Sequence, residues 1–489
     1  MSTQKCIVVL LDSLNKHYLK AYNEDAIAET PNIDAFRNDS ILFKKHYIGS
    51  APCMPARRDI FTGRYNFLER FWGGIEPFDV TLPELLKRDG VLTHMITDHT
   101  HYVEIGGENY LQQFQTWDII RGQEYDAWVS RAKKPIMYDE YFGKVNEQYE
   151  NNRTMFASEQ DYPTPKTFKT ACEWADNNKG ADNFFLMVEG FDPHEPFDCP
   201  EEYLRLYEEQ YDGPHYNWIN YGKVTEPADA IEHVRNCYRA TLTMADLWFG
   251  KFIDSLKRND LYNDALIFFI SDHGLLLGER NLTGKNLFHH YNELSAIPMI
   301  VHLPQHQNAG ETRECITQNI DLMPTILEYW NFERPAQVRG KSLKGVLEGS
   351  QDCVRENCIF GMFSGSLSYA DDQYTLYIAP DRNVPIYQYC SIATTLWNYL
   401  GVGHEDEIET GRFLKHTNYP VYKIPAKAMD AMYSENTEKT VMFDNIADYK
   451  QLKPIEDEEV YTEITKKVKQ LLIENDSPDE IFERFRLLP

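Results

Sequence analysis

Two predicted buried strands end in side chains that can bind a metal ion. Asp12 follows the apolar run at residues 6–11, and Asp272 with His273 follows the run at residues 265–270. Two carboxylates and one imidazole form an oxygen-rich donor set, which suits Ca²⁺, Mg²⁺ or Mn²⁺ better than structural zinc. A single aspartate at a strand end is more often the cap of a turn or helix, so the assignment requires that the strands meet at one place.

His194 and Lys285 are candidates for binding an anion. His194 lies in the loop "DPHEPF" after a strand-like run at residues 183–188, and prolines on both sides hold its backbone extended. An imidazole there can bind an anion or protonate a leaving group. Lys285 follows Gly284, which permits close backbone approach, and its ammonium can anchor an anionic group. Taken singly, His194 is equally well explained as a surface side chain in a rigid loop, and Lys285 is better explained as a solvated loop lysine.

Cys53 and the pair His99 and His101 complete the set of reactive side chains. Cys53 stands in "APCMPARRDIFTGR", a proline- and arginine-rich turn where a cysteine is usually structural. His99 and His101 in "ITDHTHY" share a face only in an extended strand, where they form a second imidazole group near the site. A polar strand end without a catalytic role explains them equally well.

The elements that must position these side chains are strands alternating with helices. Continuous aliphatic and β-branched runs indicate strands buried on both faces, and apolar side chains spaced by three and four residues indicate helices. The predicted strands are residues 6–11, 183–188, 265–270 and 297–304, and the predicted helices are residues 82–88 and 236–257. This alternation indicates an α/β fold with a mixed, mostly parallel central sheet flanked by helices. Because ligands bind beyond the carboxyl ends of such strands, Asp12, His194 and Asp272 are expected to converge.

The sequence pattern changes after about residue 350. We expect a catalytic domain at residues 1–350 and a smaller C-terminal α+β domain with an antiparallel sheet at residues 351–489. Short strands are predicted around the turn "ADDQ" at residues 370–373. The charged, amphipathic tail from residue 456 onward is predicted to be helical.

Composition excludes several classes of protein. The 489-residue chain carries 49 Lys and Arg against 76 Asp and Glu, a formal net charge of −27. So acidic a surface repels nucleic acid and anionic membranes, which are bound through clustered Lys and Arg. No run reaches membrane-spanning length, and the apolar run near the N-terminus is too short for a signal peptide. The nine cysteines are scattered, so we expect reduced thiols and a cytoplasmic location.

Several motifs in a fixed order resemble those of the type I sulfatases, a family of the alkaline phosphatase superfamily. The string "CMPAR" at residues 53–57, with "TGR" at residues 62–64, resembles the signature Cys-x-Pro-x-Arg followed by Thr-Gly-Arg. Five further segments of this chain resemble family motifs in the same order: "VVLLDSLN", "TPNIDAF", "DPHEPF", "ISDHGLLLGER" with a following "GK", and "DLMPTIL". The resemblance spans most of the chain and implies an alkaline phosphatase-like fold.

The resemblance also implies a specific chemistry. Cys53 would be oxidised to formylglycine by a formylglycine-generating enzyme or an anaerobic sulfatase-maturating enzyme, and the aldehyde would hydrate to a geminal diol. One diol oxygen, bound to the metal, attacks sulfur and displaces the alcohol, and loss of a proton from the second hydroxyl then expels sulfate. The implied function is hydrolysis of a small or sugar sulfate monoester, including an oligosaccharide sulfate, through a covalent sulfo-enzyme intermediate.

The family's site residues carry over one by one. The metal ligands that the resemblance implies are Asp12, Cys53 (as formylglycine), Asp272 and His273. Calcium is the first candidate ion, with magnesium or manganese as alternatives. Arg57 matches the arginine that stabilises the diol. Lys285 and His194 match groups that hold the sulfate oxygens, and one imidazole also protonates the departing oxygen.

Three departures from the family pattern leave alternatives open. Ser13 stands where many members carry a second acidic ligand, and Ala56 replaces the usual serine of the signature. The usual Lys-x-His is absent from "TDHTHY", and His99 or His101 is expected to substitute for it. Phosphonate monoester hydrolases of the same superfamily also deviate at these places, so hydrolysis of a phosphonate monoester or phosphodiester is the alternative function. An inactive homologue that only binds an anion is the second alternative.

The alcohol half of the substrate is not specified by these motifs. The aromatic-rich segments 102–150 and 201–225 are candidates for its pocket, because aromatic faces suit sugar rings and aryl groups. Packing beneath long loops explains the same aromatic residues equally well. A homo-oligomer is compatible with the sequence.

Overall fold

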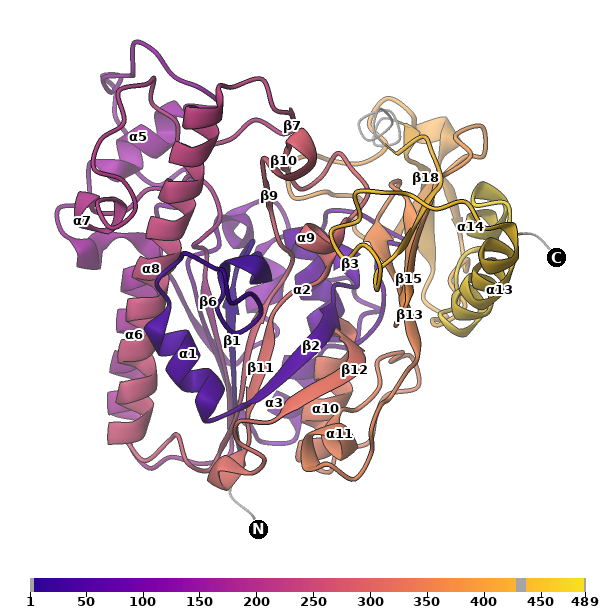
Figure 1. The fold of residues 1–489 in the computed structure, drawn as a ribbon. Helices are drawn as coiled ribbons and strands as arrows, with labels where there is room; N and C mark the ends of the chain where they lie inside the picture. The colour runs from indigo at the N-terminus through magenta and orange to yellow at the C-terminus, as the bar shows by residue number, and fades with distance from the viewer. Residues whose placement is uncertain (1–3, 428–436, 488–489) are drawn as a thin grey trace.

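The fold is organised around one large sheet. The computed structural model describes residues 4–427 and 437–487. In this part of the chain, eight strands form a sheet in the order β12-β2-β11-β8-β1-β6-β4-β5 (Figure 1). Their bounds are β1 Lys5–Leu11, β2 Ile41–Tyr47, β4 Leu92–Thr97, β5 Thr116–Ile119, β6 Phe184–Gly190, β8 Ala265–Ser271, β11 Met299–His302 and β12 Thr312–Gln318. Neighbouring strands are parallel except where β11 pairs with β8 and β2, so the sheet is mixed and mostly parallel.

Successive residues of β1 point into two separate cores. Val8 and Leu10 pack in the core that contains side chains of α2, α3 and α10, whereas Ile7 and Val9 pack in the core that contains side chains of α6 and α8. This division follows from the two-residue period of a strand buried on both faces. The helices are α1 Pro31–Asn38, α2 Cys53–Thr62, α3 Leu82–Arg88, α4 Glu108–Leu111, α5 Glu147–Arg153, α6 Pro163–Asn177, α7 Glu201–Leu204, α8 Ala228–Arg258, α9 Asn292–Ser295, α10 Leu322–Tyr329 and α11 Lys344–Glu348.

A second sheet lies beside the first, and its C-terminal strands are drawn in orange and yellow in Figure 1. Its order is β19-β15-β14-β13-β3, so its last member, β3, comes from the N-terminal part of the chain, immediately before Pro52 and Cys53. Its strands are β3 Ser50–Ala51, β13 Asn357–Met362, β14 Leu367–Asp371, β15 Tyr374–Ile378 and β19 Val441–Asp444, and helices α13 Glu458–Glu474 and α14 Asp479–Arg484 follow them. Two small three-stranded sheets contain β7 Gly222–Lys223, β9 Leu276–Leu277 and β10 Leu282–Gly284, and β16 Tyr387–Cys390, β17 Glu409–Gly411 and β18 Val421–Pro425.

The predicted α/β class, with a mostly parallel sheet and smaller antiparallel sheets, is confirmed. The predicted helix at 236–257 is longer than expected and begins at Ala228, because Ala230, Ile231 and Val234 of its first two turns are also buried in the apolar core. The predicted fourth strand is shorter, Met299–His302. The boundary at residue 350 stays a prediction, and the pairing of β3 with β13 joins the two parts by backbone hydrogen bonds. Among the described residues, helices long and apolar enough to cross a bilayer are absent.

Candidate active site

Three neighbouring parallel strands bring the predicted site residues to one edge of the large sheet. Leu11 of β1 is in register with Gly190 of β6 on one side and with Ser271 of β8 on the other. Asp12 and Asp272 are therefore the next residues of two adjacent strands. The Ser13 backbone N–H donates to Asp272 Oδ1 at 3.0 Å, which ties the two strand ends together. The convergence follows from the parallel order of β8, β1 and β6.

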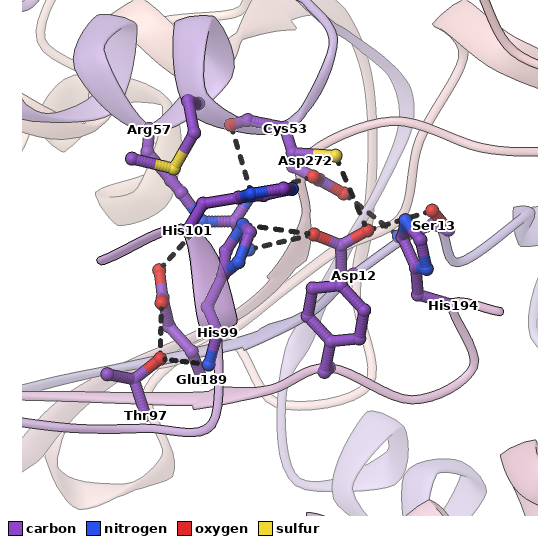
Figure 2. Close-up of polar contacts among 12 residues, drawn as sticks. Asp12, Ser13, Cys53, Arg57, Thr97, His99, His101, Glu189, His194 and Asp272 are labelled. Carbon is purple, nitrogen blue, oxygen red and sulfur yellow. Dashed lines mark hydrogen bonds and ion pairs between the residues drawn. The ribbon is translucent and has the colours of Figure 1, made fainter. Parts of the chain in front are cut away.

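Cys53 joins these side chains from the first turn of α2. Ligand atoms of Asp12, Cys53, Asp272 and His273 all lie within 4.8 Å of one another, and all four residues are buried. Cys53 Sγ lies 3.2 Å from His273 Nε2 and 3.9 Å from Asp12 Oδ1. Figure 2 shows the sulfur pointing toward the two carboxylates. The four residues that the sequence singled out as metal ligands thus form one compact cluster.

The donor set of this cluster fits a divalent cation. His273 Nδ1 lies 2.9 Å from the Gly274 carbonyl oxygen, which can only accept, so Nδ1 carries the proton and Nε2 keeps its lone pair. A hydrogen bond of this kind orients metal-binding histidines in many proteins. With Nε2 facing the carboxylates of Asp12 and Asp272, the cluster offers two anionic oxygens and one neutral nitrogen.

Arg57 connects the four-residue cluster of Asp12, Cys53, Asp272 and His273, called the metal cluster below, to the sheet. Its guanidinium donates to Asp272 Oδ2 at 2.8 Å and to Asp12 Oδ2 at 2.9 Å, and its Nε lies 3.2 Å from Glu189 Oε1. Arg57 also donates to the Cys53 carbonyl oxygen at 3.0 Å. The side chain is fully buried, and its charge is balanced by three carboxylates. Arg57 therefore sets the positions of the carboxylates and of the residue at position 53.

The ionisation of the cluster follows from burial and from this arginine. Burial alone would raise the pKa of Asp12, but Arg57 and Lys285 lower it below its ordinary value, so Asp12 is a carboxylate. Burial raises the pKa of the Cys53 thiol well above its ordinary value, and Asp12 adds to the shift. An unmodified Cys53 is thus a protonated, weakly nucleophilic thiol at neutral pH.

Lys285 points into the same cluster from the end of β10. Its Nζ donates to Ser13 Oγ at 3.1 Å and lies 3.4 Å from Cys53 Sγ, and Ser13 Oγ donates in turn to Asp12 Oδ1 at 2.8 Å. The preceding Gly284 has φ +102°, and a Cβ built there would lie 2.4 Å from the ring of Tyr221. Glycine is therefore required for the turn that delivers the ammonium group.

His194 lies on the Ser13 side of Asp12, as Figure 2 shows. Its Nδ1 donates to the Glu195 carbonyl oxygen at 2.6 Å, and its ring packs against Phe191 with 4.2 Å between ring centroids. Burial, followed by the charge of Lys285, lowers the pKa of His194 well below its ordinary value. The histidine of the "DPHEPF" loop is therefore a buried neutral imidazole of fixed orientation.

The structure separates the roles of His99 and His101. His99 Nε2 lies 3.8 Å from Asp12 Oδ2, and neither ring nitrogen of His99 has a hydrogen-bond partner among the described residues. His101 belongs to a short 3₁₀ helix, Thr100–Val103, and its Nδ1 donates to Glu104 at 2.8 Å. The two ring centroids are 4.9 Å apart. His99 therefore borders the metal cluster directly, and His101 lies one layer farther out.

Two acidic side chains in the site were missed by the sequence analysis. Glu189 directly follows the predicted strand run at residues 183–188 and lies inside the observed β6, and its place at the end of an apolar run was a usable signal. Glu124 lies within the aromatic-rich segment 102–150, and its spacing from other acidic residues gave no indication of a role. Its Oε1 lies 3.8 Å from His194 Nδ1, and burial raises its pKa to about 7.

Comparison with known proteins places this geometry in context. The family model "Sulfatase" matches residues 4–332. The chain is 24% identical over 472 residues to the multifunctional alkaline phosphatase superfamily protein PehA of Trinickia caryophylli, covering 83% of this chain and 91% of that protein. It is also 24% identical over 403 residues to an N-acetylglucosamine-6-O-sulfatase of Bacteroides thetaiotaomicron, covering 70% of each chain.

Solved structures share the fold at lower identity. A putative sulfatase, yidJ, from Bacteroides fragilis aligns with TM-score 0.69 and 17% identity over 99% of this chain and 98% of that one. A phosphonate monoester hydrolase of Agrobacterium radiobacter aligns with TM-score 0.67 and 16% identity over 96% of each chain. Both likenesses support the alkaline phosphatase-like architecture.

Proposed function

Because the chain belongs to the sulfatase family and is a sulfuric ester hydrolase, we propose that it hydrolyses a sulfate monoester with formylglycine, formed from Cys53, as the nucleophilic residue. The observation that carries this proposal is the convergence on one atom, Cys53 Sγ. Lys285 Nζ, His273 Nε2 and Asp12 Oδ1 surround it at 3.4, 3.2 and 3.9 Å. An oxygen nucleophile in the place of this sulfur stands beside an ammonium group and a metal site.

The buried thiol itself is unsuited to the reaction. Its raised pKa leaves little thiolate at neutral pH, and a sulfated thiol has no internal group that expels sulfate. A formylglycine hydrate carries two hydroxyls on one carbon. One hydroxyl oxygen forms the bond to sulfur as the alcohol leaves, and deprotonation of the other reforms the aldehyde as sulfate departs. Water then regenerates the hydrate, which completes a balanced hydrolysis.

A divalent cation fits the cluster, with calcium as our first candidate. Asp12, Asp272, His273 and the residue at position 53 would hold it, and when bound it supplies positive charge that favours the ionised nucleophile and the sulfate oxygens. Arg57 donates a hydrogen bond to each of the two carboxylates and so holds both in place.

Lys285 binds the sulfate oxygens, and His194 transfers a proton. Lys285 is 3.4 Å from Cys53 Sγ, so its ammonium can donate to the oxygens of a sulfate group attached at that position. His194 has its Nδ1–H committed to the Glu195 carbonyl, so the neutral ring has only Nε2 available for proton transfer. We assign to His194 the transfer of a proton from the attacking hydroxyl to the departing oxygen.

A sugar sulfate is the substrate class that the relatives favour. One curated relative is an N-acetylglucosamine-6-O-sulfatase, and one solved structure of similar fold is described in complex with D-glucosamine-2-N,6-O-disulfate. In this chain, the Tyr125 ring of segment 102–150 lies 6.1 Å from the His101 ring, and Tyr221 of segment 201–225 lies beside Gly284, which precedes Lys285. Aromatic side chains from both predicted segments are thus available to a sugar ring.

Hydrolysis of a phosphonate monoester or phosphodiester is the second candidate. Each of these esters is, like a sulfate monoester, a tetrahedral monoanion, so it fits the same cation pattern. Ser13 in place of an acidic ligand supports this candidate, and two solved structures of similar fold are described as phosphonate monoester hydrolases.

The decisive experiment uses protein co-expressed with a maturating enzyme. Mass spectrometry of the peptide at residues 51–64 should show the aldehyde at position 53, and the protein should release sulfate from 4-nitrophenyl sulfate. The Cys53→Ala variant should lose this activity. Higher kcat/KM on phenyl phosphonate or phosphodiester substrates than on sulfates would favour the second candidate, and an intact thiol in an active protein would refute the proposed nucleophile.

A further inference from the structure

Glu124 is a buried carboxylate for which the proposed mechanism has no use. It is 6% exposed and lies between two active-site imidazoles, with Oε1 at 3.8 Å from His194 Nδ1 and Oε2 at 3.7 Å from His101 Nε2. Both distances exceed a hydrogen bond. Oε2 has no hydrogen-bond partner among the described residues. A buried carboxylate oxygen without a donor is costly, so its retention points to a ligand.

The loop that carries Glu124 is built to hold it in place. Asp126 accepts hydrogen bonds from the Gly122 backbone at 2.8 Å and from Arg121 Nε at 2.7 Å. Glu124 itself has φ +43°, a region that a glutamate adopts only when its surroundings enforce it. The carboxylate is thus fixed toward the two imidazoles, and it does not relax to a surface position.

The two groups that face each other across the 3.7 Å gap are both acceptors. In the tautomer in which His101 Nδ1 donates to Glu104, at 2.8 Å, Nε2 presents its lone pair to Glu124. Two acceptors without a shared proton can both be satisfied by one donor group of a ligand. An ammonium group offers several N–H donors and a positive charge for the carboxylate.

Aromatic rings pack around His101. His101 packs edge-on against Trp72 with ring centroids 4.8 Å apart, and Trp397 stacks on Trp72 at 5.0 Å. The Tyr125 ring lies 6.1 Å from His101. Trp397 comes from the C-terminal part of the chain and is 45% exposed, so this aromatic group extends from the buried imidazole to solvent. Aromatic faces attract cations and stack on sugar rings.

Charge is therefore divided between two sides of the site. Lys285 and the metal ligands define the side that takes the sulfate group, and Glu124 with Glu104 makes the neighbouring side acidic. Resting on the function proposed above, we propose that Glu124, His101 and the aromatic group Trp72, Tyr125 and Trp397 form a subsite for a protonated amine on the alcohol half of the substrate. The substrate class is then an amino sugar or amino alcohol sulfate that carries a free amine.

The net charge of the protein agrees with a substrate of this kind. A chain with a formal charge of −27 repels a simple anion in solution. A sulfate monoester that also carries an ammonium group has no net charge, so this repulsion disappears. The sulfate and the amine would each meet a complementary charge only after entering the site.

The test compares amine and hydroxyl esters of the same shape. Values of kcat/KM are measured for glucosamine 6-sulfate against glucose 6-sulfate, and for 2-aminoethyl sulfate against 2-hydroxyethyl sulfate. The pH is set just above 7, where the amine is still protonated and Glu124, with a pKa of about 7, is at least half ionised. The mature protein should prefer the amine in at least one pair by about 10- to 100-fold, the effect of one charge-assisted hydrogen bond. Glu124→Gln, which keeps the size of the side chain, should bring that ratio close to one.

Matched variants separate this effect from misfolding. Glu124→Asp keeps the charge and should retain part of the preference, and Glu108→Gln, an exposed change in the nearby helix α4, should retain all of it. Melting temperatures identify any variant that fails to fold. An equal loss on both members of a pair in Glu124→Gln would show that Glu124 only positions the imidazoles, and would overturn the proposal.

Two further readouts distinguish failure of this inference from failure of the proposed function. Turnover of 4-nitrophenyl sulfate without an amine preference in either pair would overturn the amine subsite alone. Calorimetry of glucosamine and glucose binding to the Cys53→Ala protein needs no turnover. It should show tighter binding of glucosamine, lost in the double variant with Glu124→Gln, and equal binding would count against the subsite even in an inactive protein.

Discussion

Arg57 lies one helical turn after Cys53, and its guanidinium donates to the Cys53 carbonyl oxygen at 3.0 Å. The same turn of α2 therefore presents the sulfur atom of Cys53 and places the Arg57 guanidinium between the carboxylates of Asp12 and Asp272. The four-residue spacing of the "CMPAR" signature is the helical spacing that puts both side chains on one face. The signature is thus a structural unit of the site.

Arg57→Lys should disable the enzyme and weaken the fold. A lysine cannot bridge Asp12, Asp272 and Glu189 at once, because it lacks the planar fork of a guanidinium. We expect a loss of about 3–5 kcal/mol in the free energy of unfolding, since buried carboxylates lose a partner. Displaced ligands should lower kcat/KM by about a hundredfold or more. Urea denaturation and aryl sulfate kinetics measure both, with Arg37→Lys on the partly exposed helix α1 as the control.

Ser13→Asp should tighten binding of the divalent cation. Ser13 has φ +58°, which aspartate and asparagine tolerate well, so Ser13→Asn is a control of equal shape without the charge. A third carboxylate next to Asp12 should strengthen Ca²⁺ binding by about tenfold or more relative to Ser13→Asn. Calorimetric titration of the chelator-treated proteins measures the difference. Equal affinities in the two variants would mean that position 13 does not face the cation.

Three members of the candidate metal site, Asp12, Asp272 and His273, could be predicted from sequence because they follow buried strands, whereas Cys53 was included only through the resemblance to the family signature. Asp12 and Asp272 stand directly after continuous apolar runs, and such runs in adjacent parallel strands end at the same edge of the sheet. Lys285 needed the motif order of the family, since nothing in its local sequence distinguishes it from a solvated lysine. Its position depends on the turn at Gly284 and on the packing of Tyr221.

The parts of the site and fold that could not be predicted from sequence depend on contacts between segments far apart in the chain. Glu124 reaches His194 across the site, and Trp397 reaches Trp72 from the C-terminal part of the chain. The pairing of β3 with β13 likewise joins residues 50–51 to residues 361–362. No local period or spacing encodes such contacts, because they depend on how loops of the two parts are packed.

Gly284→Ala should move Lys285 and lower activity. The added Cβ would lie 2.4 Å from the Tyr221 ring, and φ +102° is strained for alanine. We expect a loss of about 1–3 kcal/mol in unfolding free energy and a fall in kcat/KM of about tenfold or more as the ammonium shifts. Gly222→Ala on the paired strand β7 is the control. Its φ of +149° is also unfavourable for alanine, but a Cβ there meets no atom within 4 Å, so the two variants differ in the contact with Tyr221. Similar kcat/KM losses in both variants would refute the role assigned to the Tyr221 contact.

His302 should make the stability of the protein depend on pH in the acid range. Burial lowers its pKa to about 4, although its Nδ1 donates to the Ala265 carbonyl oxygen at 3.0 Å. The unfolded chain binds a proton on this histidine below about pH 6.5, and the folded protein does not. Stability is therefore complete above about pH 6.5 and falls as the pH drops toward 4, by up to about 1.4 kcal/mol per pH unit.

His302→Phe should remove this dependence. The substitution keeps the ring packing against Tyr262, where the centroids are 4.3 Å apart, and removes the titrating group. It loses one hydrogen bond, so the variant should be less stable by about 1 kcal/mol at neutral pH. Between pH 6 and 5, the free energy of unfolding of the native protein should fall more than that of the variant. The difference is the contribution of about one proton, up to about 1.4 kcal/mol. Urea denaturation at several pH values measures the slopes of the two proteins. Parallel slopes for His302→Phe and the native protein would show that His302 is protonated equally in the folded and unfolded states.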